Sequence, residues 1–160
     1  MNKLSSRHYL PKRDSKEALK ELNQIFGCEI DEHEPVEVAK ASDQHLLLIQ
    51  EEPLAFRHDN HYFLTLRGLI KYKPKRRWVM VDKGAIKYVS EGADVMAPGI
   101  VSADAQIEEN DIVWVCDEGH RMPLAIGKAI MDGKQMIKAK KGKAIKSMFH
   151  VGDKLWKMQG

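Results

Sequence analysis

The residues best suited to chemistry in this sequence lie in one stretch, residues 81–100, which reads VDKGAIKYVSEGADVMAPGI. It places Lys83 and Lys87 four residues apart, so that both side chains share one face of a short helix and remain in water. Backbone N–H groups exposed near glycine can donate to phosphate oxygens, and lysines add charge without reading base sequence. Phosphate and sugar binding is therefore one interpretation. An ordinary capped helix with two solvated lysines is the other, and the spacing leaves both open.

The small residues and the proline of this stretch have expected structural roles. Gly84 permits a tight entry into the helix, and Gly92 ends it in the left-handed conformation that a β-carbon disfavours. Ala93 allows close approach to the backbone, and Pro98-Gly99 bends the chain into the next strand. The buried side of the helix is expected to consist of Ala85, Ile86 and Val89, with Tyr88 as a further candidate.

Other residue pairs that suggest metal binding or catalysis lack the partners these functions need. His58 and His61 have no cysteine nearby, and a turn between two strands explains their spacing. Cys116 and His120 lack the second pair that would complete a tetrahedral zinc site. The sequence contains no P-loop, HExxH or GxSxG motif. We therefore predict no catalytic residue, no metal and no cofactor.

Composition predicts a globular protein inside the cell. A hydrophobic fraction of 43% in 160 residues is ordinary for a folded domain. No run approaches the roughly 20 apolar residues of a membrane helix, and the first residues lack a signal core. Cys28 and Cys116 lie far apart, so thiols in a reducing compartment are favoured over a disulfide. We expect a cytoplasmic monomer that does not engage a membrane.

Charge is segregated along the chain although the net value is only +3. Residues 71–77 hold five basic side chains, and residues 134–146 hold six lysines and no acid. Acidic residues concentrate in residues 29–37 and 104–118. Such segregation creates local fields that a net charge hides, although lysine runs are also common in solvated turns.

The first half predicts a helix packed on an antiparallel sheet. Asp14 and Glu17 have the spacing of a capping box, and Gly27 is a natural stop. Between them, the apolar face consists of Ala18, Leu19, Leu22, Ile25 and Phe26. Short apolar or alternating segments then predict four or five strands, VEVAKA, HLLLIQ, LAFRH, HYFLTL and LIKYK. Residues 1–74 are therefore expected to form an α+β domain.

The second half, residues 75–160, predicts a small β-barrel that begins after the basic KPKRR junction. A helix is expected over residues 84–90. Strands are expected at residues 77–82, 94–96, 111–116, 124–131, 136–140 and 155–158.

The stretch at residues 81–100 resembles the signature of PUA domains, the RNA-binding module named after pseudouridine synthases and archaeosine transglycosylases. PLAIGKAIM (123–131) and FHVGDKLWKM (149–158) resemble the module's central and closing strands in matching order. With the RHYL start and the first helix, the chain is most similar to the family of the protein amplified in T-cell malignancy, as an archaeal-type stand-alone member. The resemblance implies an N-terminal α+β domain followed by a mainly β PUA pseudo-barrel.

The resemblance further implies binding of structured RNA, either the tRNA acceptor end or small-subunit ribosomal RNA, with a protein partner in translation. The RNA-facing residues it selects are Lys83, Gly84, Lys87, Gly92, Ala93, Pro98, Gly99 and Ile100, together with Lys154 in the closing segment. The neighbouring basic run could extend this surface as a phosphate-tracking stripe through Lys71, Lys73, Lys75, Arg76 and Arg77.

Other aromatic and acidic residues are assigned to the fold. Capping explains Asp82, because the catalytic aspartate of pseudouridine synthases belongs to a separate domain. Trp114 and Trp156 are expected to pack in barrel strands, which leaves Trp78 as a candidate base contact. Two alternative functions stay open. One is an RNA-docking accessory to a tRNA or rRNA modification enzyme, and the other is a protein-interaction module whose first domain docks a partner.

Overall fold

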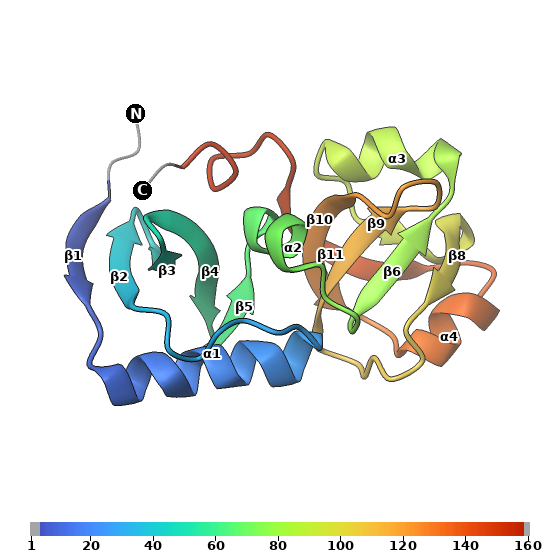
Figure 1. The fold of residues 1–160 in the computed structure, drawn as a ribbon. Coiled ribbons are helices and arrows are strands. Elements are labelled where there is room, and N and C mark those ends of the chain that lie inside the picture. Colours follow the sequence, from blue (N-terminus) through green and yellow to red (C-terminus); the bar gives the residue numbers. More distant parts are fainter. Residues whose placement is uncertain (1–3, 159–160) are drawn as a thin grey trace. The chain divides into compact units, whose positions relative to one another are not determined.

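The computed structural model describes residues 4–158, which form two compact units (Figure 1). One unit contains the chain up to Lys75 together with the segment that begins at Lys154, and the other is Arg76–Asp153. Residues 1–3 and 159–160, which the predicted domain ranges include, lie outside the described residues. None of the helices formed by residues 4–158 has the length and apolar character needed to cross a bilayer.

The first unit is built on a five-stranded sheet in which each strand pairs with the next in order, β1-β2-β3-β4-β5, all antiparallel. Tight turns join β2 to β3, β3 to β4 and β4 to β5, whereas α1 lies between β1 and β2 in the chain. Between β4 and β5 the two turn residues, Asp59 and Asn60, both have positive φ, as a type I′ hairpin turn requires. The elements are β1 (Ser5–Tyr9), α1 (Lys12–Phe26), β2 (Val36–Ala41), β3 (Gln44–Ile49), β4 (Glu52–His58), β5 (His61–Leu64) and α2 (Leu66–Tyr72).

Helix α1 buries its predicted apolar face but begins earlier than its sequence suggests. The backbone carbonyl of Pro11 accepts the Ser15 N–H at 2.9 Å, and no side chain caps this end. The predicted capping box at Asp14 is therefore wrong, because Asp14 already lies in the first turn. The predicted stop at Gly27 is confirmed by its left-handed conformation, with φ 64° and ψ 48°.

The last predicted strand of this unit, residues 69–73, is instead part of helix α2. Thr65 decides this outcome, because its Oγ1 accepts the Gly68 N–H at 3.2 Å and starts the helix. A β-carbon at Gly68 would collide with the Leu54 carbonyl, so α2 lies directly against β4. The strand that the sequence analysis did not predict is β1. Its residues are all exposed and therefore show no alternation of apolar and polar side chains.

The second unit is a six-stranded sheet in the order β7-β11-β10-β9-β6-β8, antiparallel except for the parallel pair β6 and β9. The predicted mainly β pseudo-barrel is confirmed. Its elements are β6 (Trp78–Val81), α3 (Lys83–Ser90), β7 (Val95–Met96), the 3₁₀ turn η1 (Ala97–Gly99), β8 (Ile100–Ala103), β9 (Ile112–Asp117), β10 (Pro123–Ala129), α4 (Gly133–Lys138) and β11 (Lys143–His150).

This sheet must curl, because its two edge strands are neighbours in sequence. Only η1 separates β7 from β8. The chain between Met96 and Ile100 reaches at most about 14 Å. In a flat sheet of six strands the edges would lie about 24 Å apart. Curling brings the edges together and encloses the core.

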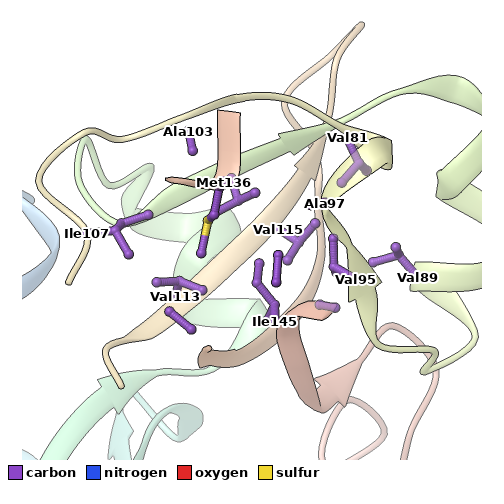
Figure 2. Close-up of a cluster of buried hydrophobic side chains, with 14 of the residues drawn as sticks. Val81, Val89, Val95, Ala97, Ala103, Ile107, Val113, Val115, Met136 and Ile145 are labelled. Carbon is purple, nitrogen blue, oxygen red and sulfur yellow. The ribbon is translucent and has the colours of Figure 1, made fainter. Parts of the chain in front are cut away.

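The interior of the curled sheet is filled by aliphatic side chains that point toward one another (Figure 2). Strands supply Val81, Val113 and Ile145, while α3 contributes Val89 and α4 contributes Met136. Each such side chain stabilises the fold by about 1.5–3 kcal/mol when fully buried. Both helices are therefore held to the sheet by their apolar faces.

Two predicted strands of the second half are wrong. Residues 136–140 lie mainly in α4, which Asp132 starts by accepting the Gln135 N–H at 2.8 Å. Residues 155–158 form a turn in which the Met158 N–H donates to the Leu155 carbonyl at 3.1 Å. The strand that completes the sheet is β11, which ends at His150.

The segment from Lys154 belongs to the first unit and not to the barrel. The Arg67 guanidinium lies 4.8 Å from the centre of the Trp156 ring, and Arg67 Nε donates to the Trp156 carbonyl at 2.9 Å. The expected place of Trp156 in a barrel strand is therefore wrong, because Arg67 of α2 holds it.

Arg67→Ala should lower the free energy of unfolding by about 1–2 kcal/mol, since it removes a cation–π contact and a hydrogen bond. Urea unfolding measures this loss. Arg57→Ala is the control, because the Arg57 guanidinium lies 5.9 Å from the Tyr62 ring and the residue is exposed. If both variants lost equal stability, the Arg67–Trp156 contact would not hold the segment.

Candidate nucleic-acid interface

Helix α3 exposes the two lysines that the sequence singled out. Asp82 starts the helix as predicted, because its Oδ1 accepts the Ala85 N–H at 3.1 Å. Val89 is buried in the core cluster, so the helix has a fixed rotation about its axis. Lys83 and Lys87 consequently lie in water, and neither ammonium has a hydrogen bond or ion pair with residues 4–158.

Two expectations about α3 are wrong. Tyr88 is not on the buried side, since 64% of the residue is exposed. Gly84 does not relieve a tight entry, because it has no positive φ and an added β-carbon would lie 3.5 Å from its nearest neighbour, Asp82 Oδ1. Gly84 is therefore exposed at a position where packing does not require a glycine.

The turn after α3 is held by strand β11. Gly92 has φ 100°, as predicted, and an added β-carbon would lie 2.9 Å from His150 Cδ2. His150 Nδ1 lies 3.1 Å from the Ser90 carbonyl oxygen and 3.0 Å from that of Val151. Both oxygens are acceptors, so Nδ1 carries the hydrogen and the ring is fixed against Gly92.

Asp94 forms the second connection between this turn and β11. Its Oδ1 accepts the Ser147 N–H at 2.8 Å, and Lys143 Nζ lies 2.8 Å from its Oδ2. The Lys143 contact, followed by the bond from Ser147, holds the pKa of Asp94 below its usual value. Ala93, between these two anchors, donates its N–H to Tyr88 O at 2.9 Å and leaves its side chain exposed.

The turn η1 lies beside the start of α3. The Asp82 N–H donates to the Gly99 carbonyl at 3.0 Å, and a β-carbon at Gly99 would approach Ala85 Cβ to 3.2 Å. Pro98 is exposed next to this contact. Ile100 differs from the other predicted contacts, because its side chain packs against the core and its backbone N–H donates to the Ala97 carbonyl.

The structure thus gathers most of the predicted RNA-facing residues on one surface, which we name the α3 surface. Its parts are joined by the contacts of Gly99 at the start of α3 and of Gly92 at its end. The α3 surface consists of Lys83, Gly84, Lys87, Gly92, Ala93, Pro98 and Gly99.

Within the second unit, Arg77 of the basic junction lies apart from the α3 surface. Arg77 is half-buried, and its guanidinium lies 3.5 Å from Asp111 Oδ1, while its backbone N–H donates to Asp104 at 2.7 Å. Arg77 precedes β6 and Lys83 follows it, so the length of the strand, about 13 Å, separates them. Arg76 is exposed at the same end of the strand.

Lys75 and Lys154 belong to the first unit. The Lys75 N–H donates to the Phe26 carbonyl at 3.0 Å. Lys154 was expected in the closing segment of the barrel. It is instead exposed in the turn that follows β11 in the chain.

The remaining candidate residues serve the fold. Trp114 is buried as predicted, and its ring N–H donates to the Arg76 carbonyl at 2.8 Å. His58 and His61 flank a hairpin turn, as expected from their spacing. Within residues 4–158, no three His, Cys, Asp or Glu side chains are grouped to hold a metal ion. Burial raises the pKa of the free thiols of Cys28 and Cys116 to about 11.

Sequence reasoning missed His150, Asp94 and Lys143. Their contacts join segments about 50 residues apart in the chain, which local spacing does not reveal. The one available signal was the lysine run at residues 134–146, whose last part enters β11 beside β7.

Comparison with known proteins agrees with this architecture. Residues 77–151 match the PUA domain, and residues 6–72 match a domain of unknown function (DUF1947). An uncharacterised protein of Methanocaldococcus jannaschii is 46% identical over 98% of this chain and 99% of its own length. Translation machinery-associated protein 20 of Eremothecium gossypii is 31% identical over 88% of this chain and 81% of its own.

A solved structure of a hypothetical protein from Pyrococcus horikoshii has the same fold. It is 38% identical, covers 94% of this chain and 97% of its own, and superposes with a TM-score of 0.83. The second unit is therefore a PUA domain, preceded by the small α+β unit. The chain belongs to the family of PUA-domain proteins that includes Translation machinery-associated protein 20 and Malignant T-cell-amplified sequence 1.

Gly92→Ala should lower the free energy of unfolding by about 2–3 kcal/mol, because it combines left-handed strain with overpacking against His150. Gly142→Ala is the matched control, since Gly142 has φ 99° and no atom within 4 Å of an added β-carbon. Strain alone should cost the control about 1 kcal/mol. Urea unfolding compares the two variants, and equal losses would mean that His150 does not restrict the turn.

The Asp94 anchor should give stability a defined pH dependence. A carboxyl whose pKa is lowered by folding stabilises the protein above its unfolded pKa, and this contribution is lost as pH falls through the folded pKa. Asp94→Asn should therefore be less stable than the wild type at neutral pH, and the difference should shrink on acidification. Thermal unfolding from neutral to strongly acidic pH measures this, and a constant difference would contradict the anchor.

Proposed function

We propose that this chain is a non-enzymatic RNA-binding protein that acts in translation, and that the α3 surface contacts the RNA. The observation that carries the proposal is the exposure of two lysines without internal partners beside a glycine turn that β11 holds rigid. Lysines that already bind carboxylates would lose those contacts on binding phosphate. Lys83 and Lys87 lose none.

The rigid turn suits the sugar–phosphate backbone of RNA. The exposed backbone around Gly84, Ala93 and Pro98 lets a ribose approach closely, since no large side chain stands in the way. Structured RNA is recognised largely through shape, phosphates and 2′-hydroxyls. A fixed surface loses little conformational freedom on binding such a shape, which favours affinity.

The names of the relatives support a role in translation, because Translation machinery-associated protein 20 belongs to this family. Within that role, the tRNA acceptor end and small-subunit ribosomal RNA are the RNA targets we propose, in the cytoplasm and with a protein partner. Arg77 is not part of the proposed contact, since Asp111 and Asp104 already engage it. We also propose Arg76 of the same unit as an RNA contact and, separately, Lys75 and Lys154 of the first unit.

The test is a titration of the full chain with intact tRNA and with the same tRNA lacking its 3′ CCA, at several salt concentrations. The double variant Lys83→Gln/Lys87→Gln should weaken binding. It should also flatten the log–log salt dependence by roughly 0.7–0.9 for each lysine that engages a phosphate. Tighter binding to intact tRNA would support the acceptor end as the target.

The matched control is Lys134→Gln/Lys138→Gln, because these lysines are also exposed and four residues apart on a short helix of the same unit. It removes the same net charge. If the control flattened the salt dependence as much as the α3 variant, attraction would depend on total charge, and the α3 surface would not be the binding site.

A further inference from the structure

Helix α3 leaves one aromatic ring largely exposed to water. Tyr88 is 64% exposed, and no ring contact or side-chain hydrogen bond within residues 4–158 holds it. An aromatic ring left in water contributes nothing to the core cluster, which α3 reaches through Val89. The fold therefore does not account for Tyr88.

Gly84 lies one helical turn before Tyr88 on the same stripe of α3. Helical side chains lean toward the N-terminus, so the Tyr88 side chain is directed along the stripe toward Gly84. Glycine in the interior of a helix costs about 1 kcal/mol relative to alanine, and this is an upper bound for Gly84 in the first turn of α3. An alanine would fit here, because the nearest atom would be 3.5 Å away. Gly84 thus keeps the space beside the ring free. Its lower helix propensity reduces stability, and packing does not require a glycine here.

Charge on this face favours a nucleic acid over a protein. Lys83 and Lys87 border the Gly84–Tyr88 stripe on the helix surface. The carboxylate of Asp82 already accepts the Ala85 N–H. Glu91 is the remaining acid of the helix end and follows Tyr88 by nearly one turn. The face therefore presents an aromatic ring beside two cations that have no partner within residues 4–158.

We propose that Tyr88 is a stacking platform for an unpaired base of the bound RNA. Lys83 and Lys87 hold phosphates of that nucleotide and its neighbour, and Gly84 leaves room for the ribose. Bases inside a duplex are already stacked on both sides, so the occupant is a single-stranded end or a loop. Stacking accepts any base, since every base has an aromatic face. This inference rests on the proposed function and specifies that the α3 surface binds an unpaired base.

The probe is a short RNA hairpin with a single-stranded 3′ extension, compared with the same hairpin ending blunt. Wild-type protein should bind the extended hairpin more tightly. Tyr88→Ala should lower affinity for the extended hairpin about tenfold and leave the blunt hairpin unaffected. The salt dependence should not change, because the ring carries no charge. Tyr88→Phe and Tyr88→Trp should retain the wild-type preference.

Tyr9→Ala is the matched control, because Tyr9 is also 64% exposed but lies on β1 of the first unit. Gly84→Ala supplies an independent variant that keeps the ring. It should raise the melting temperature and weaken binding of the extended hairpin several-fold. Gly119→Ala controls for the added methyl group, since a β-carbon there also meets only a carboxylate oxygen, Asp117 Oδ2, at 3.6 Å.

The outcomes separate this inference from the proposed function. If Tyr88→Ala bound both hairpins like the wild type while Lys83→Gln/Lys87→Gln bound them weakly, RNA binding would stand and the stacking platform would be wrong. The exposed ring would then be assigned to a protein contact. If the wild type bound neither hairpin nor tRNA in a salt-dependent way, the proposed function itself would fail.

Discussion

The second unit depends on one constraint, which is the short connection between the two edge strands of its sheet. Because η1 joins β7 to β8, the sheet closes on itself and the core lies inside the curl (Figure 2). The same connection positions α3. The Gly99 carbonyl accepts the Asp82 N–H, and the absence of a side chain at Gly99 lets η1 touch Ala85. The same short connection, η1, thus closes the barrel and positions the start of α3.

Strand β11 positions the other end of α3. His150 fills the space beside Gly92, and Asp94 accepts a hydrogen bond from Ser147 of the same strand. The exposed turn therefore has the rigidity of the sheet although it lacks regular structure. A surface fixed in this way needs no reordering when a ligand arrives, and the binding free energy is not reduced by the entropy of ordering a loop.

Local rules predicted the parts of this fold whose causes are local. The Asp82 cap, the buried Val89 and the left-handed Gly92 follow from residue type and spacing within one helix. Rules of this kind failed where a distant contact decides the structure. Residues 155–158 read as a barrel strand, yet Arg67 holds Trp156 in the first unit. The resemblance to PUA domains gave the architecture correctly, but it extended the closing strand beyond β11.

The candidate site was less predictable than the fold, because residue type does not distinguish a structural role from a binding role. A β-carbon would crowd a neighbour severely at Gly92 and mildly at Gly99, so packing within the fold accounts for both glycines. Gly84 meets no such neighbour, so packing within the described residues does not explain it. The basic residues also divide into those that the fold engages and those that it leaves exposed.

Arg77 is bound by Asp111, whereas Lys83 and Lys87 have no partner within the described residues. In the sequence, Arg77 belongs to the denser group of basic residues, at residues 71–77. In the structure, the sparse pair on α3 remains available, because burial and pairing decide which charges a ligand can use. A binding surface is therefore identified by what the fold leaves unexplained, and on α3 the unexplained residues are two lysines, one glycine and one tyrosine.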